Sequence, residues 1–232
     1  MEEDVLAAEE GTLLITSVEG DPKGRQRYLL YVNGSTEPFM SIHEDLLLRY
    51  RLFKGREIHA EELREINEED SHHRAYVMAL SYLGARPRTN KEISRYLARK
   101  GVEEASCEKA LQRLRQERLV DDDSYAAQFA AERMRNQLKG RRLLRQELEQ
   151  RGIAKETAKE AAESLDREAE AEVATRAALK KWPHVKGEPR DRKRKLMAFL
   201  LRRGFPSDAV KQALEAALES DKLDAEGPAL DN

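Results

Sequence analysis

Positively charged side chains at two places along the chain form the pattern with the clearest chemical use. Residues 133–146 hold six Lys or Arg and no acid, and residues 180–195 hold eight cations and two acids. Clustered cations attract phosphate groups or acidic protein surfaces, whereas a merely solvated helical face more often mixes both signs. Both interpretations are open from the sequence, and we favour binding. The side chains expected to contact a partner or DNA are Arg133, Arg135, Lys139, Arg141, Arg142, Arg145, Lys193, Arg194, Lys195, Arg202 and Arg203.

Residues that could catalyse a reaction or hold a metal ion do not fall into a productive spacing. The glycines never form a phosphate-binding loop, and the chain has neither a Cys-x-x-Cys nor two histidines four residues apart. Three acids, Asp121 to Asp123, precede a predicted helix, where helix capping explains them better than a metal site. The sequence therefore predicts no enzyme, no cofactor and no metal. The histidines, which we interpret as solvated surface residues, are His43, His59, His72, His73 and His184.

A fixed spacing of apolar residues, which we call the frame, occurs three times in the chain. It predicts the helices that must position the cations. In each copy a glycine ends the second helix, and apolar residues lie 8 and 4 positions before it and 1, 6, 10 and 13 after it. The glycines are Gly101, Gly152 and Gly204, 51 and 52 residues apart. This regularity predicts three tandem three-helix units. The frame residues are Ile93, Leu97, Val102, Cys107, Leu111, Leu114, Leu144, Leu148, Ile153, Ala158, Ala162, Leu165, Leu196, Leu200, Phe205, Val210, Leu214 and Ala217.

The frame also predicts how each second helix ends. A glycine just past a helix can take the left-handed conformation of a Schellman cap, with an apolar contact across the cap. The frame supplies that apolar pair in every copy, and cations in each last turn complement the helix dipole. The expected pairs are Leu97 with Val102, Leu148 with Ile153, and Leu200 with Phe205.

The segment before the repeats is rich in β-branched and aromatic residues. Residues 12–18 and 28–32 predict strands, and Asn33-Gly34 signals a two-residue hairpin leading to a third strand near Met40. A short helix over residues 43–50 and a brief extended segment at residues 57–58 should follow. Such a sheet of about three strands is too small to be stable alone and should lean on the first helices.

The predicted fold is mainly α, with a small antiparallel β module before the three repeats. A long helix is expected over residues 60–83, and Thr89 should cap the helix that holds Ile93 and Leu97. The expected segments are a disordered acidic tail at 1–10, the β module at 11–58, repeats at 59–118, 119–165 and 166–220, and a second disordered acidic tail at 221–232.

The amino-acid composition indicates the general class of the protein. Charged residues make up 37% of the 232 residues and the mean hydropathy is -0.78, which suits an elongated helical protein. No apolar run approaches the ~20 residues of a membrane span, and the acidic start does not resemble a secretory signal, so we expect a cytoplasmic protein. We further expect it to be a monomer. The single Cys107 lies on the frame and is expected to be buried. Residues 71–220 carry 33 cations and 23 acids, a basic body between acidic ends.

Several motifs together resemble the RecX family of bacterial regulators of the RecA recombinase. Thr89 to Leu97 is similar to the family's first repeat, the segment from Lys54 to Ile58 and the hairpin resemble its amino-terminal extension, and Phe199 to Phe205 is similar to its closing motif. The central signature is carried by Leu119-Val120-Asp121-Asp122, Tyr125-Ala126, Lys139-Gly140, Glu147-Leu148 and Arg151-Gly152-Ile153. The resemblance spans roughly residues 12 to 218. The acidic tails and the loop from Pro183 to Pro189 depart from it.

This resemblance implies a curved, elongated body of three-helix repeats that lies in the groove of the RecA filament on single-stranded DNA. It further implies inhibition of the filament's ATPase, strand-exchange and coprotease activities, and so a part in DNA repair, homologous recombination and the SOS response. The basic pattern is compatible with such a groove.

Two other classes of protein are open from the sequence. The residue pattern of positions 89–97 is similar to that of a helix-turn-helix. A direct DNA-binding protein that acts without RecA is therefore one alternative. Acids such as Glu156, Glu160 and Glu163 on a supposed recognition helix argue against it, because they would repel DNA phosphates. A helical-repeat scaffold for another protein is the second alternative.

Overall fold

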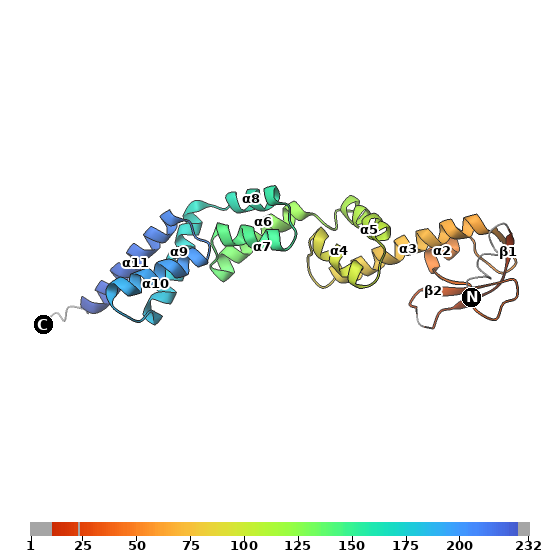
Figure 1. Ribbon diagram of the computed structural model, residues 1–232, viewed down its shortest axis with the longest axis horizontal. Helices are drawn as coiled ribbons and strands as arrows, with labels where there is room; N and C mark the ends of the chain where they lie inside the picture. Colours follow the sequence, from red (N-terminus) through yellow and green to blue (C-terminus); the bar gives the residue numbers. More distant parts are fainter. Residues whose placement is uncertain (1–10, 23, 227–232) are drawn as a thin grey trace. The chain divides into compact units, whose positions relative to one another are not determined.

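The chain forms two compact units in the computed structural model, which describes residues 11–22 and 24–226. One unit combines the described residues up to 86 with residues 94–117, and the other combines residues 87–93 with those from 118 onward. Figure 1 shows strands at the start of the chain and helices from there on. The predicted tail at 1–10 lies outside the described residues, as do residues 227–232 of the second tail.

A small antiparallel sheet opens the first unit, as predicted. Its strand order is β3-β2-β1-β4, and the brief extended segment expected at residues 57–58 is its fourth strand. The strands are β1 Thr12–Gly20, β2 Arg27–Val32, β3 Met40–His43 and β4 Glu57–His59.

The predicted two-residue hairpin at Asn33-Gly34 is wrong. Both residues take positive φ, 52° and 78°, but β3 starts only at Met40, which pairs with Leu30. The reason is that Asn33 bonds to β1 and not to β3. Its N–H donates to Leu14 O at 2.9 Å, and its side-chain Oδ1 accepts from Leu14 N at 2.9 Å. The turn therefore holds β2 against β1, and a longer loop reaches β3.

Two helices, α2 Glu44–Arg49 and α3 Ala60–Leu83, complete the core of the sheet. Their apolar faces cover the inward side chains of the strands, because three or more strands need such a layer to be stable. The sheet thus leans on the first helices, as predicted. The buried core consists of Leu13, Ile15, Leu30, Val32, Ile42, Leu46, Leu47, Leu52, Ile58, Leu63 and Ile66.

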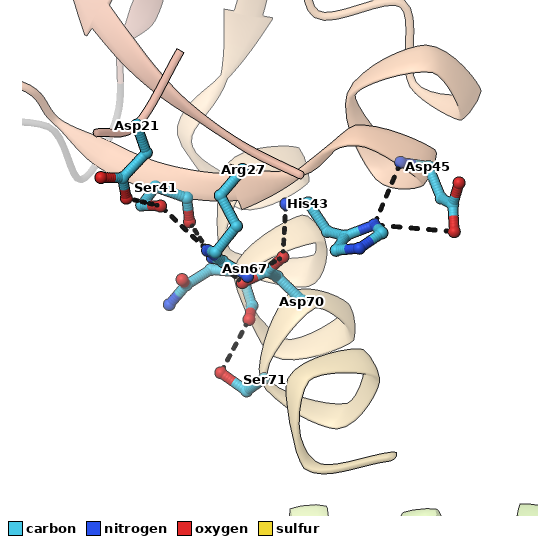
Figure 2. Close-up of polar contacts among 8 residues, drawn as sticks. All are labelled: Asp21, Arg27, Ser41, His43, Asp45, Asn67, Asp70 and Ser71. Carbon is cyan, nitrogen blue, oxygen red and sulfur yellow. Dashed lines mark hydrogen bonds and ion pairs between the residues drawn. The ribbon is translucent and has the colours of Figure 1, made fainter. Parts of the chain in front are cut away.

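A buried acid, Asp70, joins α3 to the sheet (Figure 2). Its Oδ2 accepts from Arg27 Nη2 at 2.6 Å and its Oδ1 accepts from the backbone N–H of His43 at 2.9 Å. Arg27 also donates to Ser41 O at 2.6 Å. Asp70 is only 3% exposed, so these bonds compensate for taking its charge out of water.

The other end of α3 packs on α5 through an aromatic and ionic contact. The Arg113 guanidinium lies 3.8 Å over the Tyr76 ring and bonds to Glu117 at 2.8 Å. Tyr76 Oη donates to the same carboxylate. Burial, together with the bond to Glu117, raises the pKa of Tyr76.

The predicted helices of the three repeats are all present, and a short 3₁₀ turn follows α9. Sixteen of the eighteen frame residues are buried, and the other two, Val102 and Leu111, are partly buried. The elements are α4 Asn90–Arg99, α5 Glu104–Gln116, α6 Asp122–Gln137, α7 Arg141–Gln150, α8 Lys155–Glu163, α9 Arg167–Lys181, η1 Trp182–His184, α10 Pro189–Arg202 and α11 Ser207–Glu226.

The three Schellman caps are confirmed. Gly101, Gly152 and Gly204 have φ of 77°, 89° and 86°. In each copy the residue after the glycine donates its N–H to the carbonyl five residues before it, at 3.1, 3.1 and 3.3 Å. The glycine N–H donates to the carbonyl three residues before it, at 3.0, 2.9 and 3.0 Å. The last carbonyl groups of a helix have no hydrogen-bond donor within the helix, and these bonds supply one.

The turn after α7 packs onto the start of α4. Thr89 and Glu92 form a capping box, and Thr89 Oγ1 also donates to Arg151 O at 2.8 Å. Arg151 in turn bonds to Glu92 Oε1 at 2.7 Å. A Cβ at Gly152 would overlap Cβ and Cγ of Lys91. The predicted cap at Thr89 is thus confirmed. The Thr89 hydroxyl also forms a hydrogen bond with the following repeat, at Arg151.

The first residues of the predicted second tail are helical. Helix α11 continues to Glu226, although disorder was expected from residue 221. Asp221 accepts from Arg192 Nη1 at 3.1 Å, and no glycine or proline interrupts the helix before Gly227-Pro228. An acidic composition alone does not end a helix that has no breaker.

Two glycines with the same left-handed conformation should respond differently to alanine. Gly101→Ala should cost about 1–2 kcal/mol, because a Cβ disfavours positive φ but would meet nothing within 4 Å. Gly152→Ala should cost clearly more, because its Cβ would also overlap Lys91. Denaturant unfolding of both variants measures the difference, and equal costs would contradict the packing of this turn on α4.

Candidate partner-binding surface

Two turns of the second unit meet backbone to backbone. One joins α6 to α7 and the other joins α10 to α11. Gly140 N donates to Arg203 O at 2.8 Å, and Arg142 N donates to Gly204 O at 3.1 Å. A Cβ at Gly140 would overlap the backbone of Gly204 and Phe205, so no side chain fits between the turns. The close approach brings together cations that are about sixty residues apart in sequence.

Four of the predicted binding residues gather at this contact, and we call them the joint cations: Lys139, Arg142, Arg202 and Arg203. Lys139 is neutralised by Glu147, 2.5 Å away. Arg203 donates to Gln137 O at 2.6 Å and stacks 5.2 Å from the Phe199 ring, so it keeps its charge while it fixes the turn.

The side chains of Arg142 and Arg202 are exposed. In the described part of the chain neither of them forms an ion pair. Their guanidinium groups are therefore the joint cations best placed to bind an external anion.

Arg141 has a different role from its neighbour. Its Nε bonds to Glu170 Oε2 at 2.5 Å, its backbone N–H donates to Oε1 at 2.7 Å, and the guanidinium also reaches Leu165 O. The two side chains are only 16% and 1% exposed. Glu170 neutralises Arg141 and accepts the first N–H of α7, so this pair joins α7 to α9.

The remaining predicted cations of α6 and α7 lie on the surface with local partners. Arg133 stacks 4.9 Å from the Phe129 ring, and Arg135 donates to the carbonyl of Ala131. Arg145 pairs with Glu149 one turn later, at 2.8 Å. Such exposed pairs contribute little to stability and can be exchanged for a partner's anion at small cost.

The other predicted cations of α10 lie nearer the start of that helix, away from the joint. Lys193 is nine residues before Arg202, about 14 Å along the helix axis. Arg194 pairs with Asp191 at 3.1 Å, and Lys195 donates to Lys186 O at 2.8 Å. In the frame, Lys193 and Arg194 correspond to Arg141 and Arg142, but the structure does not bring these equivalent residues together at the joint.

An apolar groove runs beside these cations between α10 and α11. Its volume is about 300 Å³, and Lys193 and Lys211 lie among its lining residues. Met197 and Leu201 in its wall are 40% and 43% exposed. A surface that combines exposed apolar side chains with cations suits a protein partner better than phosphate alone.

Models of the three RecX three-helix domains match this chain, the first at residues 75–114, the second at 121–161 and the third at 168–214. A protein of Halalkalibacterium halodurans named "Regulatory protein RecX" is 32% identical over 203 residues, which are 86% of this chain and 76% of that protein. The chain belongs to the RecX family. A RecX of Chlorobium phaeobacteroides is 37% identical over 147 residues, 63% of this chain and 95% of that one.

Solved structures agree with this assignment. The crystal structure titled regulatory protein RecX superposes with a TM-score of 0.72 at 30% identity, covering 88% of this chain and 99% of the other. A RecX from Lactobacillus salivarius has the same fold, with a TM-score of 0.60 at 23% identity over 67% of this chain and 99% of that chain. Among the described helices of this RecX-family chain, none combines the length and hydrophobicity of a membrane span.

The three acids at the start of α6 cap the helix and bond to neighbouring helices. Asp121 Oδ1 accepts from the N–H groups of Asp123 and Ser124, both at 3.0 Å, which confirms the predicted cap. The bonds from Ser124, foremost that from its N–H, lower the pKa of Asp121. Asp122 accepts the first N–H of α4, at Asn90, and Asp123 accepts from Thr157.

The interpretation of all histidines as solvated is wrong for His43 and His73, whose side chains are 12% and 15% exposed. The two rings lie 4.3 Å apart, next to Asp45. Thirty residues separate them in the RecX-family chain, so no local spacing could reveal the cluster. Glu170 was missed for the same reason, since only the fold brings it to Arg141.

Adjacent arginines on α7 should differ sharply in their effect on stability. Arg141→Ala should lower the free energy of unfolding by about 3–5 kcal/mol, because it leaves the Glu170 carboxylate buried without a counter-charge. Arg142→Ala removes an exposed side chain and should change it by less than about 0.5 kcal/mol. Urea unfolding of both variants tests this, and similar small effects would show that the buried pair does not stabilise the fold.

Proposed function

We propose that this chain regulates the RecA recombinase by binding the RecA filament on single-stranded DNA. Binding would inhibit the filament's ATPase, strand-exchange and coprotease activities, and so act in DNA repair, homologous recombination and the SOS response. The observation that carries the proposal is that a chain with all three RecX domains exposes Arg142 and Arg202 at one joint, unpaired among the described residues.

The chemistry of this surface supports a nucleoprotein partner. Arginine presents a planar fork of donors that matches both phosphate and carboxylate, and it binds them more strongly than neutral groups do. The groove beside Lys193 adds exposed apolar side chains. Such side chains form no favourable contact with DNA phosphates but can pack against a protein. We therefore assign the joint cations to anionic groups of the filament and the groove to its protein surface.

In this proposal the chain acts by binding and catalyses no reaction. It works as a monomer in the cytoplasm, where the filament forms. A direct DNA-binding helix-turn-helix role is less well supported, because Glu156, Glu160 and Glu163 are exposed on α8 and would repel a DNA backbone.

The test compares two double variants with the same change in charge. In Arg142→Ala/Arg202→Ala the joint loses two cations that form no ion pair among the described residues. In the control, Lys155→Ala/Lys159→Ala, two exposed cations of α8 are removed. The measurement is the ATPase rate of RecA on single-stranded DNA, titrated with parent and variants. The joint variant should need at least about tenfold more protein for half inhibition, since each charged hydrogen bond contributes ~1.5–3 kcal/mol.

Salt dependence of binding separates the possible partners of the joint cations. If these cations meet DNA phosphates, the joint variant should lower the salt slope by about one unit for each phosphate that it no longer binds. A weaker affinity with a slope that falls by clearly less than one unit per cation would assign them to acidic groups of RecA, because screening of such pairs releases no counterions from DNA. Equal inhibition by the joint variant and the control would contradict the proposed site. Tight binding to DNA without any effect on RecA would favour the direct DNA-binding alternative.

A further inference from the structure

Three potential metal ligands meet in the first unit, away from the joint cations. His43 lies at the junction of β3 and α2, Asp45 in the first turn of α2, and His73 within α3. His43 Nδ1 is 3.6 Å and His73 Nε2 is 3.9 Å from Asp45 Oδ2. One ligand atom from each of the three residues lies within 4.8 Å of the others. Figure 2 shows the His43 ring turned toward Asp45.

Both imidazoles have features suited to a metal ligand. His43 Nδ1 accepts from the N–H of Asp45 at 3.2 Å, so this nitrogen is unprotonated, and its lone pair can exchange that N–H for an ion. His73 Nε2 is buried and has no hydrogen-bond partner in the described part of the chain. A buried polar atom without a partner is costly, and a metal ion would supply the missing bond.

We propose that His43, Asp45 and His73 bind one first-row transition metal ion, with Zn²⁺ as the best match. Two imidazole nitrogens and one carboxylate oxygen are the donors that Zn²⁺ takes in three-ligand sites, whereas Mg²⁺ and Ca²⁺ require mainly oxygen.

The two distances to Asp45 must shorten by a few tenths of an ångström to bind the ion, and the two imidazole nitrogens, which lie within 4.8 Å of each other, must also approach. Tetrahedral zinc with bonds of ~2.0–2.1 Å places its ligands roughly 3.3 Å apart. The Asp45 side chain is 65% exposed and can move the few tenths of an ångström required. In doing so the His43 nitrogen exchanges its long hydrogen bond for coordination.

The surroundings hold the site in place. Asp70 accepts the backbone N–H of His43 and provides a nearby negative charge that favours a cation, whereas the positive charge of Arg113 near His73 opposes one. The ligands come from α3, from the last residue of β3 and from the first turn of α2. A bound ion would therefore cross-link the β module to the long helix, and it would stabilise this unit by mass action.

The experiment uses the full chain and titrates Zn²⁺, with Mg²⁺ as a comparison ion, by calorimetry and by thermal unfolding. The parent should bind one Zn²⁺ per chain and its melting temperature should rise, while Mg²⁺ has no such effect. His73→Gln should weaken the affinity for Zn²⁺ by at least about tenfold, since the loss of even an outer-shell partner costs 10–100-fold. His72→Gln, one residue away and outside the cluster, should bind as the parent does.

A second ligand variant keeps the test decisive if His73→Gln does not fold. Asp45→Asn changes an exposed side chain, so it should keep the parent's fold by circular dichroism and lose affinity to a similar extent. Equal Zn²⁺ affinity in the parent and the folded ligand variants would overturn the proposal. So would an equal loss in His72→Gln.

Discussion

The contact between the turns at Gly140 and Gly204 is the constraint on which the second unit depends. Two backbones approach so closely that a Cβ on either glycine would overlap the other turn. The approach lets Gly140 and Arg142 donate their N–H groups to carbonyls of the following repeat. Because these bonds fix one repeat against the next, they also fix which cations share a surface.

A variant of the same contact occurs at the start of α4. Thr89 stands twelve residues before Gly101, as Gly140 stands twelve before Gly152. Where Gly140 uses its backbone N–H, Thr89 uses its hydroxyl, and each donates to the carbonyl of an arginine that precedes a left-handed glycine. The repeats thus preserve a hydrogen bond while they change the group that makes it.

Carboxylates from the next repeat complete these contacts. Asp122 accepts the N–H of Asn90, and Glu170 accepts that of Arg141, which are the first residues of α4 and α7. Each acid satisfies a donor that the helix itself leaves unpaired and lies where the helix dipole favours negative charge. Part of the basic run therefore has a structural role, and Arg142 is exposed beside Arg141, which is not.

Local regularities in the sequence sufficed to predict most of the fold. The apolar frame predicted the three repeats, since helix period and burial coincide, and glycine at the helix ends specified the Schellman caps because other residues resist positive φ. Residues 60–83 were predicted as a helix with the bounds that α3 has. The prediction of a two-residue hairpin at Asn33 was wrong because a turn sequence does not indicate which strand the turn residues will hydrogen-bond to.

The pattern of residues along the chain is sufficient to predict a set of three-helix repeats with clustered cations. Those features depend on neighbours within one or two turns of a helix. Only the tertiary structure shows that Arg141 pairs with Glu170, that the turns holding Arg142 and Arg203 meet, and that the His43 ring lies near that of His73. Such pairs join residues 29 to 61 positions apart, and they come together only after packing has brought separate helices and strands into contact.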